Sequence, residues 1–376
     1  MSENTIEKIN DSNETLDENV DEEIRKEVKD KKNIKRNVLD VLFLVLVFGL
    51  TLYGVFRGEN LNQVLEDIKQ CDLYILIVPG IICVLAFIML ESVIFKYLFN
   101  TLGIKLRLTR CFLYSFVGFF FSAITPSASG GQPAQLIFMK KDKISVAHST
   151  LVLLLVTIAY KLVLVVLGGI TLIIRPKKIM AAVEGVEFWV WLGIILNVII
   201  IAAMLILVYV PSLARSFILK CVSFLNKIRI LKDKEKWVNK TEEMMEKYKA
   251  ASKYLKTHKI VLFNAFLISI VQRVALFFVT VIVYWSFHLS GTSVIEILTL
   301  QCLISVGADM LPLPGGMGIT ERLFLEMFDE AFGMLVLPAM ILSRGFSYYI
   351  QLLICAVMTV VAYLIVFKKK KRKKKE

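Results

Sequence analysis

The chain has 376 residues, of which 57% are hydrophobic, and a formal net charge of +13. Its mean hydropathy is +0.68, and several apolar runs reach the roughly 18–20 residues that span a bilayer, which argues against a soluble domain. The positive excess lies in loops and a tail between apolar runs, so it indicates membrane topology rather than nucleic-acid binding.

The cysteines and histidines do not have the spacing of a metal site or a disulfide framework. The six cysteines are scattered with no CxxC pair, and the three histidines form no HExxH pattern. Both kinds of site need such spacings. We therefore expect no bound metal, no cofactor and no nucleic-acid partner.

The first 37 residues are polar, acid-rich at the start and basic at the end. They contain no apolar core for a signal peptide, and we expect a disordered cytoplasmic segment. The basic residues stand directly before the first apolar run, 38–56, which favours a cytoplasmic amino terminus. A second span, 73–99, then returns the chain to a basic inner loop.

A short apolar run follows, and it is broken by proline and glycine. Residues 111–124 number only fourteen, too few to cross the membrane comfortably. Residues 125–133, TPSASGGQP, cannot continue a helix, because proline lacks an amide donor and glycine adds backbone freedom. Lys140, Lys141 and Lys143 follow, so we predict a re-entrant hairpin that enters and leaves from the inside.

The middle of the chain has two spans, 146–174 and 188–210, followed by its longest basic polar stretch, 211–259. Apolar residues recur through this stretch in an amphipathic pattern. Two interpretations remain open: helices that lie on the inner leaflet, or a solvated helical linker. Another span, 260–287, comes next.

A second broken region, 294–332, contains the sequence LPLPGGMGITE at residues 311–321. The last apolar run, 335–367, ends at a polybasic tail, 368–376, which we expect to be cytoplasmic. The count of crossings then requires the second hairpin to enter and leave from the outside.

These elements predict an all-α polytopic membrane protein, with a transmembrane domain at 38–367. It has about six full spans and two re-entrant broken hairpins. Each half has three crossings and one hairpin, so the halves form inverted-topology repeats. In lipid, broken backbone survives only where protein or a water-filled cavity satisfies its polar groups. Paired breaks therefore point to a transporter's binding site.

Two cations lie inside the predicted spans. Lys161 comes thirty residues after Gly131, and Arg344 comes twenty-eight after Gly316. Charges in spans are costly and usually face a cavity or a partner, although a cation near a span end can instead reach the headgroups. We predict that Lys161 and Arg344 meet the phosphate of a lipid headgroup between the hairpins, together with amides of the broken helices.

Acidic residues and one further arginine lie in or beside the spans. Asp309 and Glu321 bracket the second break, where they can pair with Arg344 or Arg322, or carry a proton. Glu91 lies near a lysine close to the inner membrane edge, so a structural ion pair is an equal interpretation. Arg273 is a further candidate for proton transfer or ion pairing.

At these residues the chain resembles a known family. PLPGGMGITE at 312–321 resembles the P-x-P-G-G-x-G-x-x-E signature of the lysylphosphatidylglycerol synthase transmembrane-region family. Residues 125–133 resemble its T-P-x-x-x-G-E/Q motif, and Arg344 with Tyr348 and Tyr349 resembles its arginine–tyrosine stretch. The resemblance covers roughly 38–367.

The chain departs from the family pattern at two places. Gln132 stands where many members carry glutamate, which puts an acidic role at this position in doubt. Tyr160 and Lys161 stand where an acid–arginine pattern is common, so the charges of that span can be arranged differently.

The resemblance implies a protein of the bacterial plasma membrane, and the basic residues next to the first and last apolar runs predict that both termini are cytoplasmic. It is similar to the flippase half of multiple peptide resistance factors, which contribute to antibiotic resistance. We therefore expect a translocator of an anionic or aminoacylated phospholipid, or of a lipid-linked headgroup. One alternative is a membrane subunit of a phosphatidylglycerol lysyltransferase with a soluble synthase partner, and another is a non-transporting scaffold.

An enzymatic role of the chain itself is not expected. In the resembling full-length proteins, lysyl transfer belongs to a separate soluble domain, and the stretch 211–259 is too small to contain one. No Ser/His/Asp or Cys/His constellation stands in its place. The oligomeric state stays open.

The predicted site combines the two breaks with the charges near them. The residues expected to bind substrate are Thr125, Pro126, Gly130, Gly131, Gln132, Lys161, Pro314, Gly315, Gly316, Glu321, Arg344 and Tyr348. The residues expected to carry a proton or form an ion pair are Glu91, Arg273 and Asp309.

Overall fold

The computed structural model describes residues 66–227, 234–309, 311 and 313–368. They belong to one compact unit, Tyr53–Glu376, and these described residues form helices and no strands. The predicted amino-terminal segment, the span 38–56 and the tail beyond 368 lie outside the described residues.

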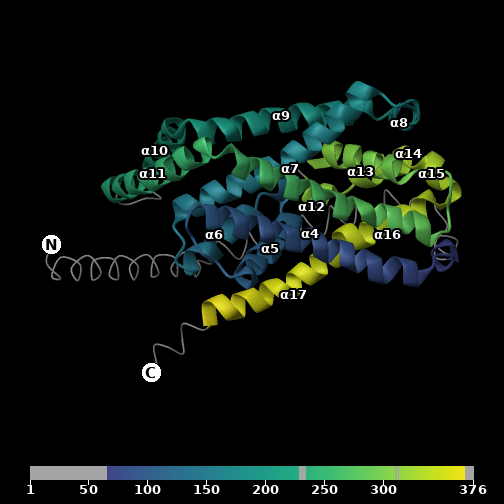
Figure 1. The fold of residues 1–376 in the computed structure, drawn as a ribbon, viewed down its shortest axis with the longest axis horizontal. Coiled ribbons are helices and arrows are strands. Elements are labelled where there is room, and N and C mark those ends of the chain that lie inside the picture. The colour runs from purple at the N-terminus through teal and green to yellow at the C-terminus, as the bar shows by residue number, and fades with distance from the viewer. Residues whose placement is uncertain (1–65, 228–233, 310, 312, 369–376) are drawn as a thin grey trace. The chain divides into compact units, whose positions relative to one another are not determined.

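Five helices in the described part are long and apolar enough to cross a membrane, which confirms the all-α polytopic class. Four of them are α4 (Leu73–Thr101), α7 (Val146–Ile174), α9 (Glu187–Tyr209) and α12 (Lys259–Ser286), shown in Figure 1. Their ends lie within two residues of the predicted spans. A short helix, α8 (Lys177–Val183), connects α7 to α9.

The fifth is the continuous helical run Asp329–Val366. It contains α15 (Asp329–Phe332), the turn η3 (Gly333–Leu335), α16 (Val336–Arg344) and α17 (Gln351–Tyr363). Its last residues belong to the π-helical segment η5 (Leu364–Lys368). A π-helical segment, η4 (Gly345–Ile350), joins α16 to α17. Such π segments inside α-helices often mark functional sites.

The first predicted hairpin is present. Helix α5 (Leu108–Ala123) is followed by the 3-10 turn η1 (Pro126–Ala128) and by α6 (Gly131–Lys141). The two helices approach closely at glycines: a Cβ on Gly118 would meet the Gln135 side chain at 2.0 Å. A larger residue at position 118 would therefore displace the Gln135 side chain, which lies between α5 and α6.

Thr125 supports the turn of this hairpin. Its hydroxyl donates to the Phe121 carbonyl at 2.6 Å and accepts from the Gly130 amide at 2.8 Å. These two bonds satisfy backbone groups that the break removes from the helix ladder. In an apolar environment an unsatisfied backbone group costs several kcal/mol, so Thr125 stabilises the break.

The second hairpin consists of α13 (Val294–Asp309), the turn η2 (Pro314–Gly316) and α14 (Ile319–Met327). Gly315, Gly316 and Gly318 have φ angles of 58°, 65° and 88°. Only glycine adopts this left-handed region without strain, so the three glycines shape the turn. The Gly318 amide donates to the Glu321 carboxylate at 2.7 Å, a contact of capping-box type at the start of α14.

The two hairpins enter the bundle from opposite ends. Helices α4 and α12 are antiparallel, because the Asp72 amide donates to the Ser286 carbonyl at 2.7 Å and Asn264 donates to the Tyr97 hydroxyl at 2.9 Å. The first hairpin follows the end of α4, and the second follows the end of α12 (Figure 1). The turns η1 and η2 contact each other, so the hairpin tips meet inside the bundle.

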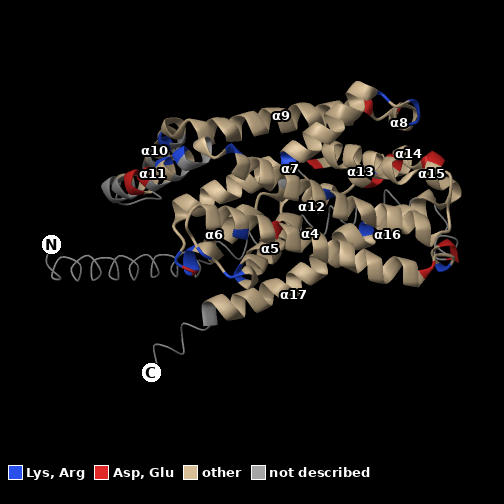
Figure 2. Ribbon diagram, in the orientation of Figure 1, with Lys and Arg blue, Asp and Glu red and all other residues tan. Residues whose placement is uncertain are grey.

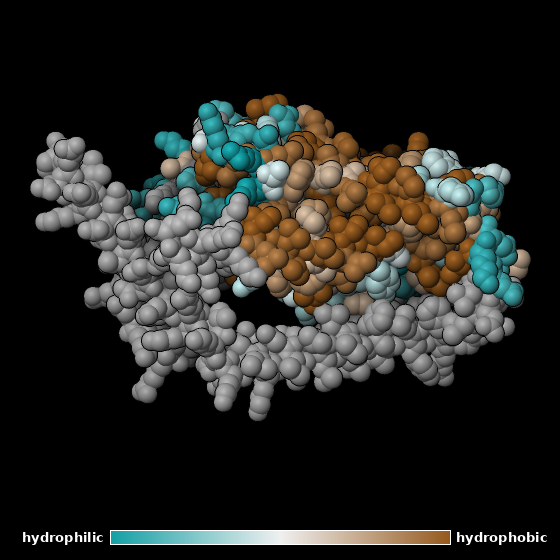
Figure 3. Space-filling view, turned by 90° about the horizontal axis from the view of Figure 1, so that it is seen from below, coloured by the Kyte–Doolittle hydropathy of each residue, from teal (hydrophilic) through white to brown (hydrophobic). Residues whose placement is uncertain are grey.

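Charged residues gather at the two ends of the helices, with few along their length (Figure 2). Lys140 and Lys141 occupy the last turn of α6, whereas Asp329 and Glu330 begin α15 near the other end. Figure 3 shows a broad hydrophobic face between hydrophilic residues at both ends. This distribution suits a membrane protein whose apolar belt faces lipid.

The stretch 211–259 forms α10 (Pro211–Lys227) and α11 (Lys234–Thr257). Helix α11 is attached to the end of α9, since Tyr248 donates to the Leu207 carbonyl at 3.2 Å and Ser252 donates to that of Val208. Arg215 and Glu242 form an exposed ion pair between α10 and α11. The hydrogen bond from Arg215 lowers the pKa of Glu242. The described parts of this stretch are thus mainly helical, and α11 packs on the bundle rather than standing free in solvent.

Thiol labelling tests the opposed hairpins. In a cysteine-free background, Lys105→Cys and Lys140→Cys lie at the open end of the first hairpin, and Ser290→Cys lies at that of the second; all three residues are exposed. An impermeant thiol reagent should label Ser290→Cys from one side of the membrane and the other two from the opposite side. Labelling of Lys105→Cys and Ser290→Cys from the same side would contradict this arrangement.

Candidate functional site

A cavity of about 510 Å³ lies where the two hairpin tips meet. Its wall includes residues of α4, both hairpins, α7, α9, α12 and the α16–α17 run. The predicted site residues that line it are Glu91, Gln132, Lys161, Arg273, Asp309, Gly315, Gly316, Arg344 and Tyr348. The cavity therefore brings together residues that are more than 200 positions apart in the sequence.

Six predicted binding residues do not line the cavity. They are Thr125, Pro126, Gly130, Gly131, Pro314 and Glu321. Thr125 and Glu321 instead support the two turns through the hydrogen bonds described above. Gly131 permits close packing, because a Cβ there would meet the Ser122 hydroxyl at 2.0 Å and the Gly118 carbonyl at 2.7 Å.

Lys161 joins the first half of the chain to the second hairpin. Its Nζ lies 2.5 Å from an oxygen of Asp309 and donates to the Asn197 amide oxygen at 3.2 Å. The Lys161 side chain is buried, with 5% of its surface exposed. Asp309 is the last residue of α13, where the helix dipole disfavours a negative charge. The positive charge of Lys161 compensates both the Asp309 carboxylate and the negative end of this dipole.

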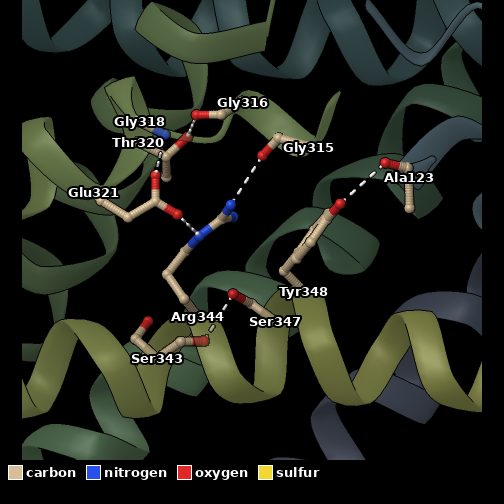
Figure 4. A network of polar contacts seen from close by, with 10 residues as sticks. All are labelled: Ala123, Gly315, Gly316, Gly318, Thr320, Glu321, Ser343, Arg344, Ser347 and Tyr348. Carbon is tan, nitrogen blue, oxygen red and sulfur yellow. Dashed lines mark hydrogen bonds and ion pairs between the residues drawn. The ribbon is translucent and has the colours of Figure 1, made fainter. Parts of the chain in front are cut away.

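Arg344 fixes the second break. Its Nε donates to Glu321 at 2.8 Å, and its Nη2 donates to the Gly315 carbonyl at 2.9 Å (Figure 4). Its guanidinium carbon lies 4.8 Å from the centre of the Tyr348 ring. The Tyr348 hydroxyl donates to the Ala123 carbonyl at 3.0 Å, so this cluster also ties η2 to the end of α5.

Arg273 is the third cation in the cavity wall, and it lies near the middle of α12. Its guanidinium carbon is 4.4 Å from the centre of the Tyr160 ring and 5.4 Å from that of Phe87. Among the described residues, no carboxylate forms an ion pair with it, and its buried Nε has no hydrogen-bond partner. Arg273 thus differs from Lys161 and Arg344, which are both paired with acids.

Glu91 lies in α4 and shares the cavity wall with Arg273. One of its oxygens accepts a hydrogen bond from Gln135 at 3.2 Å. In the described part of the chain it forms no ion pair, either with Lys96 or with Arg273, although it interacts electrostatically with Arg273. The ion pair with a nearby lysine, one interpretation of the sequence, is therefore not formed in this structure.

Two polar residues at the site were missed by reasoning from the sequence. Asn197 holds Lys161 and donates to the Gly193 carbonyl at 2.9 Å, and Gln135 holds Glu91. A buried amide side chain in an apolar helix is costly unless it is hydrogen-bonded. The lone asparagine in the apolar stretch 187–209 could therefore have identified Asn197 as a residue with a polar partner inside the bundle.

We expect the Arg344–Glu321 pair to stabilise the fold. Arg344→Gln should lower the free energy of unfolding by about 3–5 kcal/mol, because it strands a buried carboxylate. Glu321→Gln in the same chain should restore much of this loss. Thermal unfolding in detergent measures both effects, and Arg322→Gln, in the exposed Arg322–Glu326 pair, is the control. Equal stability of Arg344→Gln and the wild type would contradict the structural role of the pair.

The chain matches one protein family over most of its length. The match to the family described as "Lysylphosphatidylglycerol synthase TM region" covers residues 37–355. No curated protein gives a significant match. The match and the apolar helices support a multi-pass membrane protein in lysylphosphatidylglycerol metabolism. The predicted family is confirmed: the chain belongs to the lysylphosphatidylglycerol synthase transmembrane-region family.

Proposed function

We propose that this protein is a lipid translocator of flippase type. It moves the headgroup of an anionic or aminoacylated phospholipid, or of a lipid-linked compound, between the leaflets of a bacterial plasma membrane. The observation that carries the proposal is the charged cavity at the meeting point of two hairpins that enter from opposite ends.

The cavity offers charged and hydrogen-bonding partners to a lipid headgroup, and the hydrocarbon core of the bilayer offers none. A phosphate cannot cross hydrocarbon without partners for its charge and its oxygens, and charges within spans usually mark such a path. Three cations and two acids line this cavity: Lys161, Arg273, Arg344, Glu91 and Asp309. The acyl chains stay in lipid, because burying them in protein gains little over the bilayer.

The order of elements supports inverted repeats. Helix α4, the first hairpin and α7 are followed later by α12, the second hairpin and the α16–α17 run. Helices α4 and α12, which hold equivalent places in this order, are antiparallel. In this proposal the two halves rock against each other and expose the cavity to one leaflet and then the other, as transporters with inverted repeats do.

Lys161 has the role of a gate residue in this mechanism. Its ion pair with Asp309 links α7 to the end of the second hairpin, so rocking of the halves must change this contact. A headgroup phosphate can exchange with the carboxylate at Lys161 as the cavity opens. Arg344 keeps the second tip folded through Glu321 and the Gly315 carbonyl while the halves move.

The charged residues at the helix ends indicate how the protein is oriented in the membrane. In this proposal the basic end of α6 and the basic helix α11 face the cytoplasm by the positive-inside rule. Both chain termini lie on the same side, because basic residues precede the first apolar run and form the tail. An anionic inner leaflet also attracts basic residues near the surface. The chain acts alone in this proposal, and a soluble synthase partner is the alternative suggested by the family description.

Translocation in proteoliposomes tests the function. Purified protein should move a fluorescent phospholipid out of reach of an impermeant quencher faster than protein-free liposomes do. Lys161→Gln should abolish the movement. The double variant Lys161→Gln with Asp309→Asn should recover the wild-type melting temperature but not transport, because the cavity then lacks the exchangeable charge.

Lys178→Gln is the matched control, because Lys178 forms an exposed ion pair with Glu296 at 3.6 Å, away from the cavity. It should transport as the wild type does. Recovery of transport in the double variant would show that the Lys161 pair is only structural. No movement of any lipid by the wild-type protein, with or without a soluble synthase, would contradict the translocator itself.

A further inference from the structure

We infer that Arg273 and Glu91 form a split-charge subsite for a headgroup that carries both a phosphate and an amine. Arg273 takes the phosphate, and Glu91 takes the ammonium. The inference rests on the proposed function, because it assigns the class of headgroup that this cavity binds. It assigns the first binding of the headgroup to Arg273 and Glu91, whereas Lys161 meets the phosphate only when the halves move and its pair with Asp309 changes.

The charge balance of the cavity leads to this pair. Lys161 is neutralised by Asp309 at 2.5 Å, and Arg344 is neutralised by Glu321 at 2.8 Å. Arg273 and Glu91 are the charged lining residues that remain without an ion pair among the described residues. One cationic and one acidic side chain are thus available, which matches a headgroup with both a phosphate and an amine rather than a purely anionic one.

Arg273 is arranged to present hydrogen-bond donors to an anion. The Tyr160 and Phe87 rings lie 4.4 and 5.4 Å from its guanidinium carbon, and such contacts orient the planar group. The adjacent Gln272 donates to the Phe87 carbonyl at 3.2 Å, which fixes α12 against α4 at this level. A guanidinium has five N–H donors and binds phosphate in a bidentate manner, and none of these donors has an acceptor in the described part of the chain.

Glu91 is held in a defined position with acceptor capacity to spare. Gln135 donates both to Glu91 at 3.2 Å and to the Tyr114 carbonyl at 3.1 Å, so its amide is fixed between them. The side chains of Gln272 and Ser115 also interact with the Glu91 carboxylate. A carboxylate can accept about four hydrogen bonds, so one position remains for an ammonium. Phe87 and Phe119, whose ring centres are 4.7 Å apart, also line the cavity and can contact the cation through their faces.

Arg273 and Glu91 both line the cavity, so one ligand in it can contact both side chains. Arg273 and Glu91 interact electrostatically but do not form an ion pair. A headgroup with phosphate and amine compensates both charges at once. A phosphate-only headgroup, such as phosphatidylglycerol, compensates Arg273 but leaves Glu91 beside an added negative charge, so it should bind more weakly.

Binding of two short-chain lipids to the purified full chain tests the subsite. Isothermal titration compares dihexanoyl phosphatidylethanolamine, which carries an amine, with dihexanoyl phosphatidylglycerol, which does not. The wild-type protein should bind the amine-bearing lipid about tenfold more tightly, which corresponds to about 1.4 kcal/mol. Glu91→Gln should remove this preference, and Arg273→Gln should weaken the binding of both lipids.

Two further variants make the result specific. Arg273→Lys keeps the charge but not the bidentate donors, so it should also bind both lipids more weakly. Arg322→Gln removes an exposed arginine of α14 and should bind both lipids as the wild type does. Thermal melts show which variants are folded, and if Arg273→Gln does not fold, Arg273→Lys decides the phosphate assignment.

Wild-type affinity in both Arg273 variants would overturn the phosphate assignment. An unchanged lipid preference in Glu91→Gln would overturn the amine assignment. Translocation by the same preparations separates this inference from the proposed function. Selective binding without transport would contradict the translocator alone, whereas transport that is independent of Arg273 and Glu91 would contradict the subsite alone.

Discussion

The structure depends on one constraint: lipid offers no hydrogen bonds, so the two broken helices must satisfy their backbone groups within the protein. Side chains from other elements do this at both tips. Arg344 binds the Gly315 carbonyl and Tyr348 binds the Ala123 carbonyl, while Thr125 holds the first turn from within its own hairpin. Because the last helical run supplies partners to both tips, it brings the tips together, and the cavity lies where they meet.

The absence of polar partners in lipid also explains how the buried charged side chains are arranged. A buried ion pair contributes little net stability but is costly to break, so the Lys161–Asp309 and Arg344–Glu321 pairs act mainly to hold particular elements together. Both pairs involve the second hairpin, at the end of α13 and at the start of α14. A mid-helix cation without such a pair, like Arg273, needs water or a ligand instead. The arrangement therefore divides the cavity between groups that maintain its walls and groups that are open to a headgroup.

Much of this fold was predictable from the sequence, and the reason is physical. The length of an apolar run sets a span, so α4, α7, α9 and α12 end within two residues of their predicted bounds. The proline and glycine residues likewise allowed the positions of the two helix breaks, η1 and η2, to be predicted. The partners of the charges were not predictable in the same way: Lys161 and Asp309 are 148 positions apart, and hydropathy does not set how far each helix is rotated. Arg273 was predicted as a candidate because it lies within a span. That it forms no ion pair with a described residue could not be predicted, because this depends on the rotation of α12 and its neighbours.

The most direct test of this account is an experimental density map of the protein with an amine-bearing phospholipid. The account predicts headgroup density in the cavity between η1 and η2, with the phosphate beside Arg273 and the acyl chains leaving toward the bilayer. Lipid density confined to the outer hydrophobic surface, with the two tips packed together and no cavity between them, would contradict it.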